Sequence, residues 1–216
     1  MRWAAIALAL ALAGCGAGID EPAASSDPAE PVDATDLDAV RTPPILQDFS
    51  IGGDFALSAH DGSTFNLAEH RGEVFLLFFG YTHCPDFCPA TLSLLGQAYD
   101  LVGEEAEDVG TLFVTIDPAR DTPQAMAEYL SYFGVPALGL TGSEEDVAAV
   151  LASYAGMAET QEGDDGEPIF GHTTYTYLID HEGRVRYLFR ADDTPIFIAA
   201  GLREQVRIAA AAADPN

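Results

Sequence analysis

The sequence predicts an α/β fold in which helices cover a partly parallel β-sheet. Residues 74–79 are a continuous apolar run, which is typical of a strand buried on both faces of a sheet, and residues 111–116, a mainly apolar run with two threonines, predict a second buried strand. A segment expected to be helical follows each run, and strands that alternate with helices form α/β sandwiches. Apolar residues make up 48% of the chain and charged residues 20%, so most of it can bury a core.

The folded domain is expected over residues 45–213, and it begins with a short hairpin. Two strands, at 47–58 and 63–67, are expected around the turn sequence His-Asp-Gly at residues 60–62. The elements expected after this hairpin are a strand over 74–79, a helix over 89–102, a strand over 111–116, a helix over 122–133 and a short strand over 138–140.

The second half is expected to contain a helix, a hairpin and a final helix. Ser143 is a good N-cap, and the acidic residues 144–146 fall in the first turn, where the positive helix end favours them. Strands over 173–179 and 185–189 flank the turn sequence His-Glu-Gly, and a helix over 195–211 follows. Two antiparallel strands before a last helix are the order found in thioredoxin.

The charge of the chain excludes two classes of partner. It has 35 acidic residues against nine basic ones, all of them arginine, which gives a net charge of −26. A general nucleic-acid binder needs a basic face, and so does a polybasic membrane anchor. The acidity is interpreted as a solvated surface, with attraction of a cationic partner as the alternative.

Residues 1–14 are predicted to be a signal peptide. A short positive start precedes an apolar run over residues 4–13, which is too short to span a bilayer that needs about 20 residues. Residues 12–15, Leu-Ala-Gly-Cys, resemble the lipobox of bacterial lipoproteins, in which the cysteine is acylated after cleavage. Cys15 is therefore the expected lipidation site, and a plain signal peptide with an incidental cysteine is the alternative.

Residues 15–44 are expected to be the acylated cysteine followed by a disordered acidic linker. Between residues 20 and 38 there are seven acidic residues, with no basic and no aromatic one. Such a segment cannot bury enough apolar surface to offset its ordering entropy. The protein is thus predicted to be a lipid-anchored lipoprotein of the cell envelope that faces the periplasm.

The residues that carry chemistry follow the first buried strand. Residues 80–89, Gly-Tyr-Thr-His-Cys-Pro-Asp-Phe-Cys-Pro, lead from this strand into a helix, where ligand sites of open α/β sheets collect. Pro89 is expected at the first helical position, which would place Cys88 at or near the N-cap and Cys84 one turn earlier. Because the positive helix end favours thiolates, the two cysteines could bind a soft metal or form a disulfide.

The spacing of these cysteines favours metal binding. Cys-x-x-x-Cys differs from the Cys-x-x-Cys of thioredoxin-type redox pairs and leaves room for a third ligand. Thiolates and imidazole suit Cu(I), whereas structural zinc would need a fourth ligand. A structural disulfide is the alternative for an exported chain, although so short a loop contributes little stability.

The third ligand would be one of five histidines. His83 adjoins Cys84 but is expected to point away from it, because neighbours in an extended segment face opposite sides. His172 is expected at the start of a central strand, beside the cysteine loop in the thioredoxin arrangement; taken alone, such a histidine is more often a satisfied core or surface residue. The others are expected in exposed turns or loops: His60, His70 and His181.

Three segments resemble the SCO/SenC family, the copper chaperones of cytochrome c oxidase assembly. They are residues 79–89, residues 117–123 (Asp-Pro-Ala-Arg-Asp-Thr-Pro) and residues 172–180. The resemblance extends from about residue 46 to the last helix. It implies a thioredoxin-like fold with an added N-terminal β-hairpin and an insertion before the C-terminal β-hairpin. That insertion would be residues 156–170, expected to be a mobile loop.

The resemblance also implies the site residues. Cys84, Cys88 and His172 would bind one copper ion, as Cu(I) and also as Cu(II). Asp117 matches an acidic residue implicated in the family's metal site, and an Asx cap on the turn into the next helix is its alternative role. Gly171 stands where an acidic residue often precedes the histidine, which affects a local hydrogen bond rather than the ligand.

The function implied is that of a metallochaperone rather than an enzyme, with the copper A site of cytochrome c oxidase subunit II as the recipient. The alternative is a thiol–disulfide oxidoreductase that keeps the recipient's cysteines reduced. Cys84 and Cys88 would then be the catalytic pair, joined as a disulfide in the oxidised form. A copper or redox sensor is a third reading. Further partners would be other periplasmic copper or thiol carriers.

Overall fold

The structure is a computed structural model that describes residues 47–162 and 168–214. Within these two ranges, none of the helices has the length and apolar character needed to cross a bilayer. Several predictions lie outside the described residues: the signal peptide over 1–14, the linker over 15–44 with Cys15, and residues 163–167 of the insertion.

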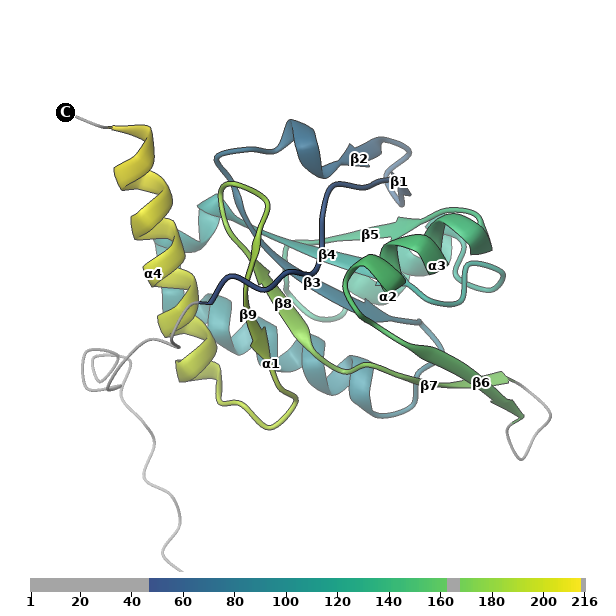
Figure 1. The fold of residues 1–216 in the computed structure, drawn as a ribbon. Coiled ribbons are helices and arrows are strands. Elements are labelled where there is room, and N and C mark those ends of the chain that lie inside the picture. Colours follow the sequence, from purple (N-terminus) through teal and green to yellow (C-terminus); the bar gives the residue numbers. More distant parts are fainter. Residues whose placement is uncertain (1–46, 163–167, 215–216) are drawn as a thin grey trace, which may run out of the picture. The chain divides into compact units, whose positions relative to one another are not determined.

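A seven-stranded sheet forms the centre of the domain (Figure 1). Its strands are β1 (Ala56–Ala59), β2 (Thr64–Asn66), β3 (Val74–Gly80), β4 (Val109–Thr115), β5 (Ala137–Thr141), β8 (Thr176–Ile179) and β9 (Val185–Phe189). They lie in the order β2-β1-β5-β4-β3-β8-β9. β3, β4 and β5 run parallel, and the other neighbouring pairs are antiparallel. The prediction of a partly parallel sheet is confirmed.

The helices cover both faces of this sheet. The α-helices are α1 (Phe87–Val102), α2 (Pro123–Leu130), α3 (Glu144–Ser153) and α4 (Pro195–Ala213), and short 3-10 helices are η2 (Leu67–Glu69) and η3 (Gly103–Asp108). α1 and α4 share one apolar cluster with Leu76 of β3. The ring of Tyr154, at the end of α3, contacts Phe79 of β3 and Tyr177 of β8 on the opposite face. Every residue of β3 is buried, as its apolar run predicts.

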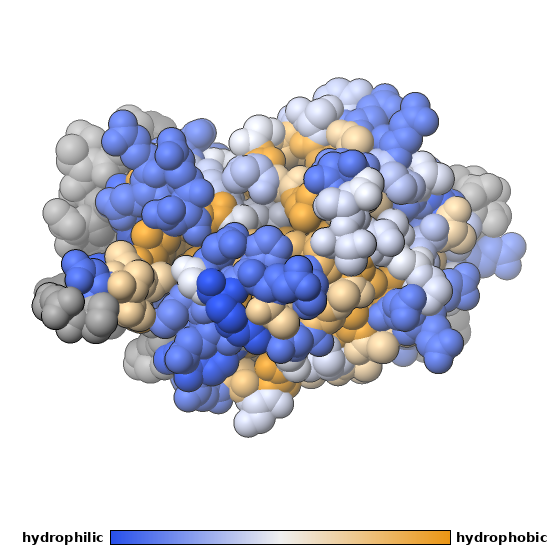
Figure 2. Space-filling view, turned by 90° about the horizontal axis from the view of Figure 1, so that it is seen from above, coloured by the Kyte–Doolittle hydropathy of each residue, from blue (hydrophilic) through white to orange (hydrophobic). Residues whose placement is uncertain are grey.

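The N-terminal hairpin is present but shorter than predicted. β1 pairs with β2 and, on its other side, with β5, so the hairpin extends the sheet. The Nδ1 atom of His60, expected in an exposed turn, accepts a hydrogen bond of 2.8 Å from the backbone N–H of Gly139. The turn is thereby tied to β5. From above this part of the molecule, hydrophilic residues cover much of the surface and hydrophobic ones lie in smaller areas among them (Figure 2).

The predicted N-cap of α3 is confirmed. The Ser143 hydroxyl accepts a hydrogen bond of 3.1 Å from the backbone N–H of Asp146, and three acidic residues occupy the first turn. Thr122 caps α2 and Thr194 caps α4 in the same way. Side-chain oxygens at these positions satisfy backbone donors that have no partner inside the helix.

The described ends of the insertion form a β-ribbon rather than the loop expected there, and residues 163–167, in the centre of the predicted loop, lie outside the described residues. β6 (Ala158–Glu162) and β7 (Pro168–His172) pair antiparallel in a separate two-stranded sheet (Figure 1). Phe170 anchors this ribbon to the domain, because its ring lies 5.2 Å from the ring of Tyr81. His172 consequently ends β7, whereas the central strand β8 begins only at Thr176.

Candidate metal centre

The two cysteines lie where β3 passes into α1. The helix begins at Phe87, with Asp86 as its N-cap residue, so Cys88 lies in the first helical turn and Pro89 is not the first helical residue. A proline in the first turn costs no hydrogen bond, since the N–H groups there have no partner within the helix. The backbone N–H of Cys88 points at the Cys84 sulfur, 3.4 Å away. The loop therefore holds both sulfurs at the positive end of α1.

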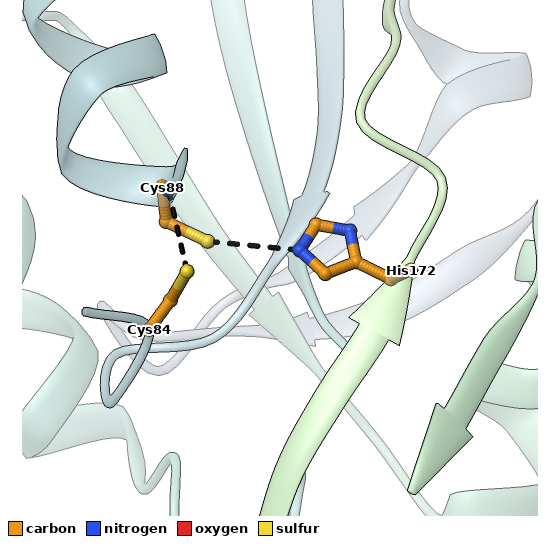
Figure 3. A group of neighbouring side chains, drawn as sticks. All are labelled: Cys84, Cys88 and His172. Carbon is orange, nitrogen blue, oxygen red and sulfur yellow. Dashed lines mark hydrogen bonds between the residues drawn. The ribbon is translucent and has the colours of Figure 1, made fainter. Parts of the chain in front are cut away.

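His172 reaches these sulfurs from the end of β7 (Figure 3). Its Nε2 atom lies 3.9 Å from Sγ of Cys88. Its Nδ1 atom lies 2.8 Å from the backbone carbonyl oxygen of Thr173. Because a carbonyl oxygen only accepts, Nδ1 carries the proton of the neutral ring, and the lone pair of Nε2 faces the sulfurs. This is the tautomer that metal-ligating histidines adopt, with the second ring nitrogen fixed by a backbone carbonyl.

The three side chains form a group of suitable size for a metal ion. Their ligand atoms, two sulfurs and one nitrogen, all lie within 4.8 Å of one another. Sγ of Cys88 and Nε2 of His172 are 3.9 Å apart. In an equilateral triangle with this side, an ion at the centre would lie about 2.3 Å from each corner, which is close to ordinary metal–sulfur distances. Two thiolates and an imidazole suit soft ions such as Cu(I).

The two cysteines differ in protonation. The Cys88 thiol donates to the Cys84 sulfur, and this lowers the pKa of Cys84 well below its usual range, while burial opposes the shift. The same hydrogen bond and burial raise the pKa of Cys88. Cys84 is 9% exposed and Cys88 is fully buried. Cys84 is therefore the thiolate, and the structure distinguishes two cysteines that the sequence left equivalent.

Aromatic residues enclose the imidazole. The ring of His172 lies 6.1 Å from that of Tyr81 and 6.4 Å from that of Phe78. The Tyr81 hydroxyl accepts a hydrogen bond of 3.4 Å from the backbone N–H of Phe170 and interacts with Cys84, and burial raises its pKa. Tyr81 thus contacts both halves of the site, although the sequence analysis did not select it.

Asp117 lies outside the group formed by the cysteines and His172. It is buried, and its carboxylate accepts from Nε of Arg120. Thr122, rather than Asp117, supplies the side-chain cap of α2. Asp117 belongs to a second group of possible ligands, together with His83 and Asp121. His83 is exposed, with Nδ1 3.8 Å from an Asp121 oxygen.

Asp121 holds the cysteine loop in place through hydrogen bonds. Its fully buried carboxylate accepts from the backbone N–H of Thr82 at 3.0 Å and from the Thr82 hydroxyl at 2.6 Å. It also accepts from the Thr115 hydroxyl at 2.6 Å. Three donors therefore occupy this carboxylate, which makes it a structural link between the loop and the end of β4. Its place in the segment 117–123 was the only sequence signal for this role.

Comparison with known proteins agrees with this architecture. Residues 44–207 match the sequence profile of the SCO1/SenC family. An SCO2-like protein of Rickettsia felis is 37% identical over 147 residues, which cover 67% of this chain and 72% of the relative. Protein SenC of Rhodobacter capsulatus is 32% identical over 149 residues, covering 69% and 67% respectively.

Solved structures show the same fold. Copper-bound ScoI of Bradyrhizobium japonicum superposes with a TM-score of 0.67 at 37% identity, covering 72% of this chain and 99% of that one. Copper-bound ScoI of Arabidopsis thaliana gives a TM-score of 0.68 at 33% identity, covering 73% and 99%. Sco proteins have a thioredoxin-like fold, so this prediction is confirmed. The chain belongs to the SCO1/SenC family.

Proposed function

We propose that this protein binds one copper ion through Cys84, Cys88 and His172 and delivers it to another protein. One observation carries the proposal: the Nε2 lone pair of His172 faces two sulfurs within a group whose ligand atoms lie within 4.8 Å of one another. The copper-bound structures of relatives with 37% and 33% identity support the choice of metal.

Three ligands leave the copper ion open to a fourth one from a recipient. Cu(I) is stable at low coordination number with soft ligands, and Cu(II) accepts imidazole and thiolate as well. A recipient thiolate or imidazole can bind first and the donor's ligands leave in turn, so that the ion is never released to water. We propose the copper A site of cytochrome c oxidase subunit II as the recipient, on the resemblance of the three sequence segments to the family.

The ligand set is tested by copper titration of the reduced full-length protein in detergent. We expect one Cu(I) per chain, and a loss of affinity of about 100-fold or more in His172→Ala, since removing a ligand costs more than removing its supporting residues. His83→Ala is the matched control, because this exposed histidine adjoins Cys84 but lies in the other group. Equal affinity of wild type and His172→Ala would refute the proposal, and a loss only in His83→Ala would assign the metal to the second group.

Delivery needs a separate experiment. Cu(I)-loaded protein is mixed with the reduced, copper-free copper A domain of subunit II, the two proteins are separated, and the copper content of the recipient is measured together with the charge-transfer absorption that appears after one-electron oxidation with ferricyanide. Cys84→Ser should abolish delivery, because serine supplies no soft ligand. Absence of transfer from the wild-type protein would remove this recipient.

A second candidate function is thiol–disulfide exchange, favoured by the unequal cysteines. The Cys84 thiolate would attack a recipient disulfide, form a mixed disulfide and release one recipient thiolate. Cys88 would then lose its proton and attack the Cys84 sulfur, which releases the second recipient thiol and leaves a Cys84–Cys88 disulfide. The recipient gains two electrons, and an external dithiol must restore the pair. His172→Ala should retain this reductase activity while copper affinity collapses.

For the location of the protein we propose the cell envelope, with the domain facing the periplasm. Acylation at Cys15 would attach the chain to a membrane, and the acidic segment 15–44 would serve as the tether. Several acyl chains on one residue anchor stably, whereas a single chain binds only marginally. Other periplasmic copper or thiol carriers would be able to meet the domain there.

A further inference from the structure

Arg120 connects the main domain to the ribbon that carries His172. It lies in the loop between β4 and α2. Its Nη2 atom donates a hydrogen bond of 2.9 Å to the backbone carbonyl of Pro168, the first residue of β7. Its guanidinium carbon lies 5.9 Å from the centre of the Phe170 ring. One side chain thus contacts two residues of the strand that ends at His172.

The other side of the Arg120 guanidinium is fixed by a buried carboxylate. Nε donates to Asp117, which is 5% exposed. The backbone N–H of Asp117 in turn donates 2.9 Å to the Thr115 hydroxyl at the end of β4. The planar guanidinium presents its donors in a rigid fork, so a partner on each side fixes its orientation. Asp117 and Arg120 therefore form a rigid bridge from β4 to β7.

Few other contacts among the described residues hold the ribbon formed by β6 and β7 against the rest of the domain. Among the described strands, β6 and β7 pair only with each other. A cavity of about 460 Å³, lined by Asp117, Leu151, Ala158, Pro168 and Phe170 among others, separates the ribbon from α3. Close packing on that side is thus incomplete, and Tyr81 holds Phe170 from the sheet side. The place of β7 therefore depends on a small number of side chains.

We propose that Arg120 is a positioning residue for the copper site, which it serves by clamping β7 so that the His172 imidazole faces the two sulfurs. Asp117 acts through Arg120 by orienting its guanidinium. The inference rests on the proposed copper function and assigns Asp117 a role at a distance from the metal. Supporting residues of metal ligands commonly contribute about 10–100-fold in metal affinity.

A double-mutant cycle in the full-length protein tests this role. Cu(I) affinity is measured by chelator competition for wild type, Arg120→Gln, His172→Ala and the double variant. We expect Arg120→Gln to lower the affinity about 10–100-fold when His172 is present. In the His172→Ala background it should have less than about a threefold effect, because no imidazole is left to position. Arg207→Gln is the matched control, since Arg207 forms an exposed ion pair within α4.

The outcomes separate this inference from the proposed function. An equal loss in both backgrounds, or no loss with His172 present, would overturn the positioning role while the copper site stands. A wild-type affinity independent of His172 would overturn the site and the inference together. Arg120→Lys is a second variant in case Arg120→Gln misfolds. It keeps the positive charge beside Asp117 but lacks the planar, forked donors of the guanidinium. The Cu(II) electron paramagnetic resonance spectrum of Arg120→Lys should show weakened nitrogen coupling, and a spectrum identical to that of wild type would contradict the inference.

Discussion

Sγ of Cys88 lies 3.9 Å from Nε2 of His172, although 84 positions separate the two residues in the chain. Cys88 is fixed in the first turn of α1, directly after the central strand β3. His172 arrives from a ribbon outside the main sheet. The site therefore consists of a rigid half that holds the sulfurs and a separate half that supplies the nitrogen.

Cys84 should react with iodoacetamide much faster than Cys88. The pKa of Cys84 is lowered to about 3, so Cys84 is a thiolate at neutral pH. The hydrogen bond to Cys84 and burial raise the pKa of Cys88, so Cys88 stays protonated there. Between pH 6 and 8 an ordinary thiol reacts about tenfold faster for each pH unit, because its pKa is about 8.5. Peptide mapping after timed alkylation should show a nearly constant rate at Cys84. Similar labelling of both cysteines, with a steep rise in rate, would contradict the assignment.

Asp121→Asn should destabilise the domain. The buried carboxylate accepts from two donors of Thr82 and one of Thr115, and an amide can accept from only part of this set. We expect the free energy of unfolding to fall by about 2–4 kcal/mol, since hydrogen bonds to charged groups contribute about 1.5–3 kcal/mol each. Urea denaturation measures this change. Asp100→Asn, at an exposed position of α1, should stay within about 0.5 kcal/mol of wild type, and a similar effect of both substitutions would argue against the structural role of Asp121.

Gly80→Ala should disturb the cysteine loop. A Cβ atom at this position would lie 2.9 Å from the rings of Phe78 and Phe113 and 3.0 Å from Sγ of Cys88. We expect a loss of about 1–3 kcal/mol in stability, as for other overpacked cores, together with weaker copper binding.

Gly171→Ala is the matched control for this substitution. The nearest atom to its added Cβ would be Nε2 of Gln161, 3.8 Å away, although His172 is the next residue. Its stability and copper affinity should equal those of wild type within about 0.5 kcal/mol. Both variants are compared by urea denaturation and chelator competition. If Gly80→Ala were as stable as Gly171→Ala, the loop would accommodate the added methyl group and the prediction would be wrong.

Cys15→Ala should release the protein from membranes. If Cys15 is acylated, cells fed a labelled fatty acid should incorporate label into the wild-type chain and none into the variant. The variant should also leave the membrane fraction, because the acyl chains supply the anchoring free energy. Cys84→Ala serves as the control and should be labelled normally. Label retained in Cys15→Ala would refute acylation at this residue.

The buried strands and the cysteine loop were predictable because they depend on local patterns. The apolar run of β3 and the Ser143 cap are properties of neighbouring residues, and the structure has both as expected. The grouping of His172 with the cysteines came from resemblance to a family, since sequence spacing alone does not bring distant residues together. The structure places these three side chains side by side.

The ribbon was not predictable, because tertiary contacts rather than its own sequence stabilise it. Its strand β6 is exposed throughout and carries acidic residues, with no apolar alternation to indicate a strand. Phe170 against Tyr81 and Arg120 against Pro168 supply contacts that a linear pattern does not contain. The bridge formed by Asp117 and Arg120 also depends on tertiary contacts, so it was not predictable from the sequence either.

Because β6 and β7 form a sheet of their own, the donor that they carry is a modular part of the protein. An engineer could exchange this ribbon for one that ends in methionine, cysteine or aspartate while leaving the pairing of the seven strands unchanged. In such chimaeras the two cysteine ligands would stay the same, and only the third ligand would change from a soft to a harder donor. The architecture thus offers a scaffold for tuning selectivity among Cu(I), Zn²⁺ and harder cations one donor at a time.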